Sequence, residues 1–204
     1  MTINTRIVYC SAALVALILP AAAQTSNPPA HPPATINQRK ENQQDRIANG
    51  VASGQLTAGE AANLEKKESN LNKEEKLMRS EDHGKLTGAD RKVLNQQQNQ
   101  LSNQIYKDKH NAVVQNTKPK SEVGKRAENQ QDRIAQGIKS GQLTAGEASH
   151  LESKDAAINR EIHNDRAANG GKLTAQEKTQ VNRQQNNVSK QIYKDKHNGR
   201  RQAH

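Results

Sequence analysis

Large apolar residues are sparse along this chain, and beyond the first 23 residues most of them recur at helical spacing. Leu94, Leu101 and Ile105 lie seven and eleven positions apart, which places all three on one face of a helix. No window alternates apolar and polar residues long enough to predict a strand. The pattern therefore predicts an all-α protein.

The same pattern occurs twice, because residues 41–111 are repeated at residues 128–198 without insertion or deletion. The shift is 87 residues throughout, and more than half of the aligned positions are identical. Val181, Val188 and Ile192 stand in the second copy where the apolar residues named above stand in the first. An internal repeat of this length predicts two tandem copies of one small folded unit.

A shorter motif, Gly-x-Leu-Thr-x-x-acid, occurs twice in each copy. Glycine accepts the left-handed backbone that ends a helix, threonine caps the next helix, and the acid three residues later completes a capping box. The motif that ends in Asp90 is expected to form the weakest capping box, because an aspartate side chain reaches back to the threonine less easily than a glutamate side chain does. The predicted cap residues are Gly54, Thr57 and Glu60; Gly84, Thr87 and Asp90; Gly141, Thr144 and Glu147; Gly171, Thr174 and Glu177.

Two such turns in each copy predict three helices per copy. The expected ranges are 37–52, 58–80 and 88–110 in the first copy and 124–139, 145–167 and 175–197 in the second. The apolar stripe of the middle helix consists of Leu64, Leu71 and Met78 in the first copy and Leu151, Ile158 and Ile162 in the second. A stripe that is kept while its members differ indicates a buried face.

The flanking segments have other compositions. Arg6, the apolar run 12–19 and the small residues 21–23 are typical of a secretory signal peptide, so we expect cleavage near Ala23 and a location in the periplasm or outside the cell. Cys10 lies inside this signal. The predicted organisation is a signal peptide at 1–23, a proline-rich spacer at 24–36, repeat units at 37–111 and 127–198, a basic linker at 112–126 and a frayed basic tail at 199–204.

The formal charge of +10 belongs mainly to the signal, linker and tail, since the two copies are nearly neutral. This distribution predicts weak, salt-sensitive attraction to an anionic envelope component, and it does not predict a specific nucleic-acid groove. After removal of the signal no apolar run is long enough to span a membrane. The sequence names no protein partner and leaves the oligomeric state open.

The turn motif resembles the loop of EF-hand proteins, with Gly54 at loop position six and Glu60 at position twelve. EF-hand loops bind calcium through oxygen ligands, mostly carboxylates. In residues 49–60, however, Val51 occupies a ligand position, and Asn49, Ser53 and Glu60 are the only weak calcium candidates. The resemblance therefore implies EF-hand-like helix pairs that have lost most calcium ligands, and no cofactor is predicted.

Two further resemblances concern location and function. The Leu-Thr pairs 56–57, 86–87, 143–144 and 173–174 resemble the motif of Spy/CpxP-type periplasmic proteins, which implies a stress chaperone, although an acid stands here where that motif has glutamine. The whole unit resembles repeats in uncharacterised small secreted proteins of Gram-negative bacteria. That likeness implies an exported protein and brings no activity.

No arrangement of residues suggests an enzyme, because the chain lacks a nucleophile elbow, a phosphate loop and a zinc signature. His110 and His197 close the duplicated Tyr-Lys-Asp-Lys-His-Asn segment and are expected to balance the helix dipole; a metal role with Asp108 and Asp195 is the alternative. Paired carboxylates such as 74–75 and the Gln/Asn runs 96–99 and 184–187 are expected on solvated helix faces. We therefore expect a non-enzymatic binding or structural module.

Overall fold

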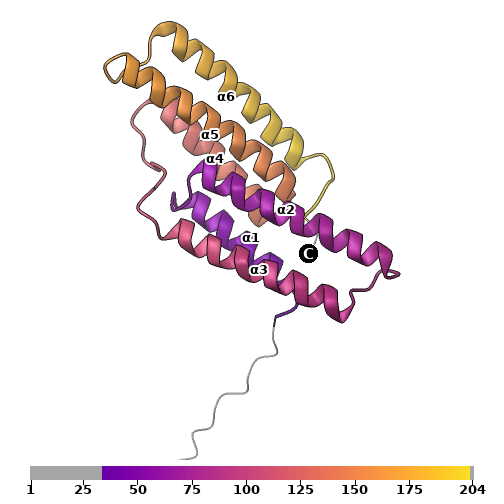
Figure 1. The fold of residues 1–204 in the computed structure, drawn as a ribbon. Coiled ribbons are helices and arrows are strands. Elements are labelled where there is room, and N and C mark those ends of the chain that lie inside the picture. Colours follow the sequence, from indigo (N-terminus) through magenta and orange to yellow (C-terminus); the bar gives the residue numbers. More distant parts are fainter. Residues whose placement is uncertain (1–33, 203–204) are drawn as a thin grey trace, which may run out of the picture. The chain divides into compact units, whose positions relative to one another are not determined.

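The computed structural model describes residues 34–202, which form six α-helices and no strand (Figure 1). The all-α prediction is confirmed, and each helix boundary lies within two residues of the expected one. The helices are α1 (Ile36–Ala52), α2 (Ala58–Glu81), α3 (Gly88–Lys109), α4 (Glu122–Lys139), α5 (Ala145–Ala168) and α6 (Ala175–Lys196). The expected signal peptide at 1–23 and most of the spacer at 24–36 lie outside the described residues.

The two copies pack against each other, a point on which the sequence was silent. Within each copy the third helix lies against the other two, so α3 contacts α1 and α2, and α6 contacts α4 and α5. Between the copies, α2 packs against α5 and α1 against α4. The described residues therefore belong to one compact unit.

Two hydrophobic clusters form the core, and they contain the apolar stripes that the sequence predicts, except that Met78 is only partly buried and packs against the edge of its cluster. Each cluster also includes one alanine from the other copy. Ala48 of α1 belongs to the cluster of the second copy, and Ala135 of α4 belongs to the cluster of the first. Small side chains at these equivalent positions let the two helices approach closely.

The leucines of the first turn motif in each copy are core residues. Leu56 and Leu143 are fully buried, and the backbone N–H of each donates to the carbonyl of a glycine in the preceding helix, Gly50 or Gly137. A Cβ placed on Gly50 or Gly137 would come within 2.7 or 2.6 Å of that leucine side chain. Both helical glycines therefore make room for the leucine that follows them.

Buried glutamines join the first and third helices, which corrects the expectation that the Gln/Asn runs are solvated. Gln98 is only 2% exposed and donates through Nε2 to the carbonyl of Ile36 at 3.0 Å. Gln43 in turn donates to the carbonyl of Gln98 at 2.7 Å. The second copy has the same arrangement in Gln130, Gln185 and Val123. An amide can be buried here because it pairs with backbone carbonyls of the facing helix.

The linker is shorter than the predicted range 112–126, since α4 already begins at Glu122. Ser121 caps this helix, and its hydroxyl accepts from the backbone N–H of Gly124 at 3.2 Å. A serine cap followed by an acid in the first turn outweighs the low helix propensity of the glycine.

The described part of the tail is not frayed. Gln202 is 4% exposed, and its backbone N–H donates to the carbonyl of Gly141 at 3.1 Å. The linker makes the equivalent bond from Gln115 to Gly54 at 2.8 Å. The tail residues 199–202 therefore follow the course that the start of the linker takes in the other copy.

Between residues 34 and 202, no helix combines the length and apolar character needed to cross a membrane.

Candidate functional site

The four turn motifs form complete capping boxes. In each, the threonine side chain accepts from the backbone N–H of the acid, and the acid side chain accepts from the threonine backbone N–H. Asp90 achieves this as well as the glutamates do, at 2.8 Å from the Thr87 nitrogen. The motif glycines have φ from 65° to 89°, in the left-handed region. The motif residues thus serve to end and start helices.

In the first turn of each copy, the motif glutamate has a second partner that sequence reasoning missed. The amide of Asn111 donates to Glu60 at 2.6 Å, and that of Asn198 donates to Glu147 at 2.7 Å. The last residue of the duplicated Tyr-Lys-Asp-Lys-His-Asn segment therefore fastens the end of the third helix to the start of the second.

The three weak calcium candidates have separate local environments. The two oxygens of Glu60 accept from Thr57 and Asn111, and the Ser53 hydroxyl lies 3.3 Å from the carbonyl of Gly50. Asn49 is exposed. Over residues 34–202 no group of three or more His, Cys, Asp or Glu side chains has a geometry that could hold a metal ion.

His110 and His197 lie at the C-caps of α3 and α6. Nδ1 of each histidine ring hydrogen-bonds to the backbone carbonyl of a tyrosine one turn earlier, at 2.7 Å, and each histidine ring stacks on the ring of that tyrosine. Asp108 accepts from Gln104, and Asp195 accepts from Gln191. At each helix end, the histidine and the aspartate therefore hydrogen-bond to different residues and not to each other.

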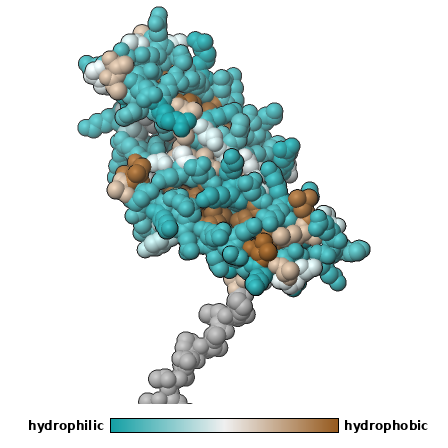
Figure 2. Space-filling view, in the orientation of Figure 1, coloured by the Kyte–Doolittle hydropathy of each residue, from teal (hydrophilic) through white to brown (hydrophobic). Residues whose placement is uncertain are grey.

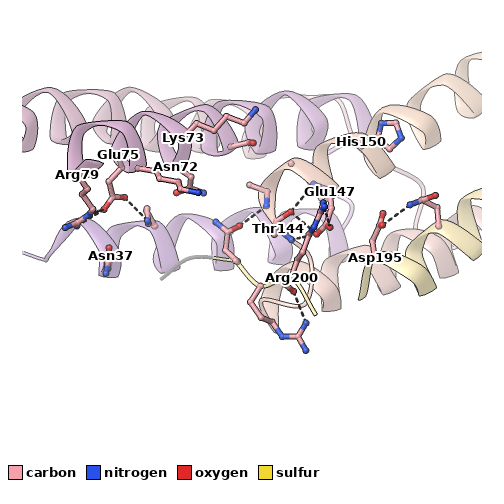
Figure 3. Close-up of a pocket in the computed structure, with 18 residues that line it drawn as sticks. Asn37, Asn72, Lys73, Glu75, Arg79, Thr144, Glu147, His150, Asp195 and Arg200 are labelled. Atoms are coloured by element: carbon pink, nitrogen blue, oxygen red, sulfur yellow. Dashed lines mark hydrogen bonds and ion pairs between the residues drawn. The ribbon is translucent and has the colours of Figure 1, made fainter. Parts of the chain in front are cut away.

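A groove of about 950 Å³ lies between the two copies (Figure 3). We call it the inter-repeat groove; its walls are the C-terminal half of α2, the start of α5 and residues 200–202, with smaller contributions from the start of α1 and the end of α6. Six cationic side chains and three carboxylates line it, together with His150. The cations are Lys40, Lys73, Lys76, Arg79, Arg200 and Arg201, and the carboxylates are Glu75, Glu147 and Asp195.

One wall of this groove contains a buried ion pair, which corrects the expectation that Glu75 lies on a solvated face. Glu75 is 5% exposed and accepts from the ammonium of Lys40 at 2.8 Å and from the guanidinium of Arg79 at 2.7 Å (Figure 3). Burial acts to raise the pKa of Glu75, but the hydrogen bonds from these two cations lower it below the usual value. The carboxylate therefore stays ionised and fixes Lys40 and Arg79 in the wall.

The opposite wall is held by the end of the chain. The side-chain oxygen of Gln202 accepts from the backbone N–H of Ala145, at the start of α5, at 2.8 Å. The guanidinium of the neighbouring Arg200 lies 3.7 Å from Glu147. This docking brings Arg200 and Arg201, which the sequence places in a tail, to the same groove as the lysines of α2.

The equivalent region on the other side of the molecule differs because the linker passes through it. Residues 115, 116 and 119–121 line a smaller hollow of about 410 Å³, and Pro119 packs against Gly124 of α4. Ile162 and His163 of α5 stand there where α2 has Glu75 and Lys76. The two copies therefore differ here in both charge and shape, and the groove with an excess of cationic side chains lies beside α2.

Where α2 and α5 face each other, they bury four carboxyl groups. Glu65 and Glu68 of α2 stand at the positions that Glu152 and Asp155 occupy in α5. All four side chains are buried. Sequence reasoning missed them because an acid in a polar helix carries no signal of burial; only their positions within the apolar stripe could have indicated it.

No protein-family model, curated protein or solved structure matches this chain.

Proposed function

We propose that the protein is an exported, non-enzymatic helical binding module that holds an anionic ligand of the periplasm or cell exterior in the inter-repeat groove. The observation that carries this proposal is the convergence of six cationic side chains from segments far apart in sequence on one groove. Helix packing brings α1 and α2 to the groove, and the docking of Gln202 brings the chain end.

The electrostatics of the lining support an anion. Of the three carboxylates, Glu75 is already paired with Lys40 and Arg79, and Glu147 is engaged by its capping threonine, by Asn198 and by Arg200. The third, Asp195, accepts from the neutral amide of Gln191, so the six cations still outnumber the carboxylates by three. Lys73, Lys76 and Arg201 are exposed at the groove. Several cations at the rim of one groove attract a polyanion more strongly than the same charges dispersed over a surface.

Heparin serves as a polyanionic probe for this function. Replacing Lys73, Lys76 and Arg201 by glutamine removes three groove charges while leaving the buried Glu75 pairs in place. We expect at least tenfold weaker binding of fluorescein-labelled heparin at low salt and a shallower dependence of log Kd on log salt concentration, because fewer counterions are released. Fluorescence anisotropy from 20 to 200 mM salt measures both quantities.

A matched control removes the same number of charges elsewhere. Lys92, Lys178 and Lys190 are exposed on α3 and α6 and do not line the groove. Their replacement by glutamine should leave most of the affinity intact. An equal loss of heparin binding in both triple variants would mean that net charge alone attracts the polyanion, and it would reject the groove as the site.

The chaperone alternative requires exposed apolar surface. Over residues 34–202, the exposed large apolar side chains lie on separate elements: Leu77 on α2, Val93 and Tyr106 on α3, Val113 and Val114 in the linker, and Tyr193 on α6. The face in Figure 2 is mostly hydrophilic, with small separate apolar areas. This dispersal favours groove binding, and a lack of aggregation suppression at equimolar client would reject the chaperone.

A further inference from the structure

At the interface between the two copies, the four buried acids of α2 and α5 have more carboxyl oxygens than there are side-chain groups that donate hydrogen bonds to them. Glu65, Glu68 and Glu152 are fully buried, and Asp155 is 3% exposed. The donors that reach them are two glutamine amides of the flanking helices. Gln44 of α1 donates to Glu65 at 3.2 Å.

In the second copy, one amide serves two acids. Nε2 of Gln131 in α4 donates to Glu152 at 2.8 Å and to Asp155 at 2.9 Å. Several buried oxygens remain without a partner among the described residues: Oε1 of Gln44, Glu65, Gln131 and Glu152, and both oxygens of Glu68. Buried acceptors without donors are costly, whereas a protonated carboxyl supplies an O–H donor. The donor shortage therefore favours protonated acids.

The charged groups around the cluster do not neutralise it. From α1, Lys40 attracts Glu68, but its ammonium is hydrogen-bonded to Glu75, and Glu75 repels Glu68. In α4, Ala127 stands at the position equivalent to Lys40, so the second copy lacks this cation. Across the interface, Glu65 repels Glu152.

Burial is the largest influence on these groups. It raises the pKa of Glu65 to about 8 and the pKa of Glu68 to about 7, with repulsion between the two acids adding to the effect on Glu65. It raises the pKa of Asp155 to about 7 and that of Glu152 well above its usual value, the latter also through Asp155. The hydrogen bonds from Gln44 and Gln131 act in the opposite direction and do not outweigh burial.

We propose that the α2–α5 interface is a proton-dependent clamp, which holds the two copies together while the four buried carboxyls carry protons and loosens when they ionise. With protons present, the carboxyls supply O–H donors to a cluster that has more buried acceptors than donors. Once ionised, the carboxylates repel one another across the interface and require water. Both effects favour separation of α2 from α5.

This device goes beyond the proposed binding function and does not depend on it. The same two helices provide walls of the inter-repeat groove, through Lys73 and Lys76 of α2 and His150 of α5. Loosening of the clamp would therefore also change the geometry of the groove.

The pH dependence has a definite sign. An acid whose pKa is higher in the folded than in the unfolded protein binds its proton more tightly when folded, so it stabilises the fold fully below the unfolded pKa. That stabilisation is lost as the pH rises through the folded pKa. The free energy of unfolding should therefore decrease from about pH 5 to pH 8. For each carboxyl that retains its proton in the folded protein, the unfolding constant should rise by up to about tenfold per pH unit.

Urea unfolding between pH 5 and 9 tests this directly. The variant Glu68→Gln, Asp155→Asn replaces two buried carboxyls at equivalent positions. It reduces by up to two the number of protons that the folded protein binds in excess of the unfolded protein. The unfolding constant should therefore rise less steeply with pH than in the parent, by about 100-fold per pH unit at most. The control Asp45→Asn, Asp132→Asn changes equivalent exposed positions and should follow the parent curve. Parallel curves for the parent and the buried variant, or equal flattening in the control, would overturn the proposal.

A disulfide across the interface provides a readout that keeps all four carboxyls. A Cβ built on Gly59 of α2 lies 4.0 Å from the Cβ of Ala156 of α5, within the range of a disulfide. In the reduced Gly59→Cys, Ala156→Cys protein, hydrogen-exchange protection of α2 and α5, corrected for intrinsic exchange, should drop between pH 6 and 8. Oxidation should restore it. Protection that is independent of pH, or of oxidation, would refute a clamp even if the amide variant fails to fold.

A cation could supply the same positive charge as the protons. Calcium and magnesium chloride are therefore added separately to the parent protein at pH 8. The clamp predicts no recovery of the stability measured at pH 5. Recovery that disappears in the Glu68→Gln, Asp155→Asn variant would assign the cluster to a metal ion and overturn the proton-dependent mechanism.

Discussion

At the scale of single residues, glycine has two distinct roles in this protein. The turn glycines adopt positive φ, whereas Gly50 and Gly137 lie within helices and leave space for a leucine side chain. The first role follows from the motif. The second is also local, because the leucine lies six residues after each of these glycines, but the sequence does not show that its side chain packs back against the helix.

Replacing Gly137 by alanine should lower the free energy of unfolding by about 1–3 kcal/mol, because the new Cβ would overlap with Leu143 in a close-packed core. Urea unfolding at constant pH measures the change. Gly88→Ala is the matched control, since it lies in the first turn of α3 with no atom within 4 Å of the added Cβ. We expect that control to be neutral or slightly stabilising, through lower entropy of the unfolded chain. A neutral Gly137→Ala would show that Leu143 can move aside.

At the scale of elements, helix ends are determined locally. The threonine and the acid of each turn satisfy backbone N–H groups that no helical hydrogen bond reaches, and these residues are three positions apart in sequence. This proximity explains why the helix ranges could be predicted closely from the sequence.

Thr144→Ala should cost about 1 kcal/mol of stability, since it leaves the N–H of Glu147 without its cap. Thr179→Ala changes a threonine on the exposed face of α6, where the hydroxyl bonds to the carbonyl one turn earlier, and alanine has the higher helix propensity. Thermal unfolding followed by circular dichroism should show a lower Tm for the first variant alone. A similar fall in both would mean that capping is not the cause.

At the scale of the whole molecule, the packing of helices that are distant in sequence, both within a copy and between the copies, decides which polar residues become buried. Glu65 and Glu152 are acids in polar helices until α2 meets α5, and Gln98 is one glutamine in a polar run until α1 lies beside it. The inter-repeat groove likewise includes Arg200 and Arg201 because Gln202 docks residues 200–202 beside α5.

Each copy places one alanine in the hydrophobic cluster of the other copy, and this contact can be tested at Ala135. This residue is 4% exposed within the cluster of the first copy, although it belongs to the second. Ala135→Leu should destabilise the protein by about 1–3 kcal/mol through overpacking, as measured by urea unfolding. Ala89→Leu on the exposed side of α3 should change stability little. Tolerance of leucine at Ala135 would show that the copies can separate there without cost.

The sequence by itself determined the helices, because apolar spacing and capping boxes act between residues fewer than a dozen positions apart. It determined neither the groove nor the buried carboxyls. Those depend on side chains brought together from helices far apart along the chain, such as Glu65 with Glu152 and Lys73 with Arg201. Burial and the electrostatic environment are properties of such neighbours, so only the tertiary structure could decide them.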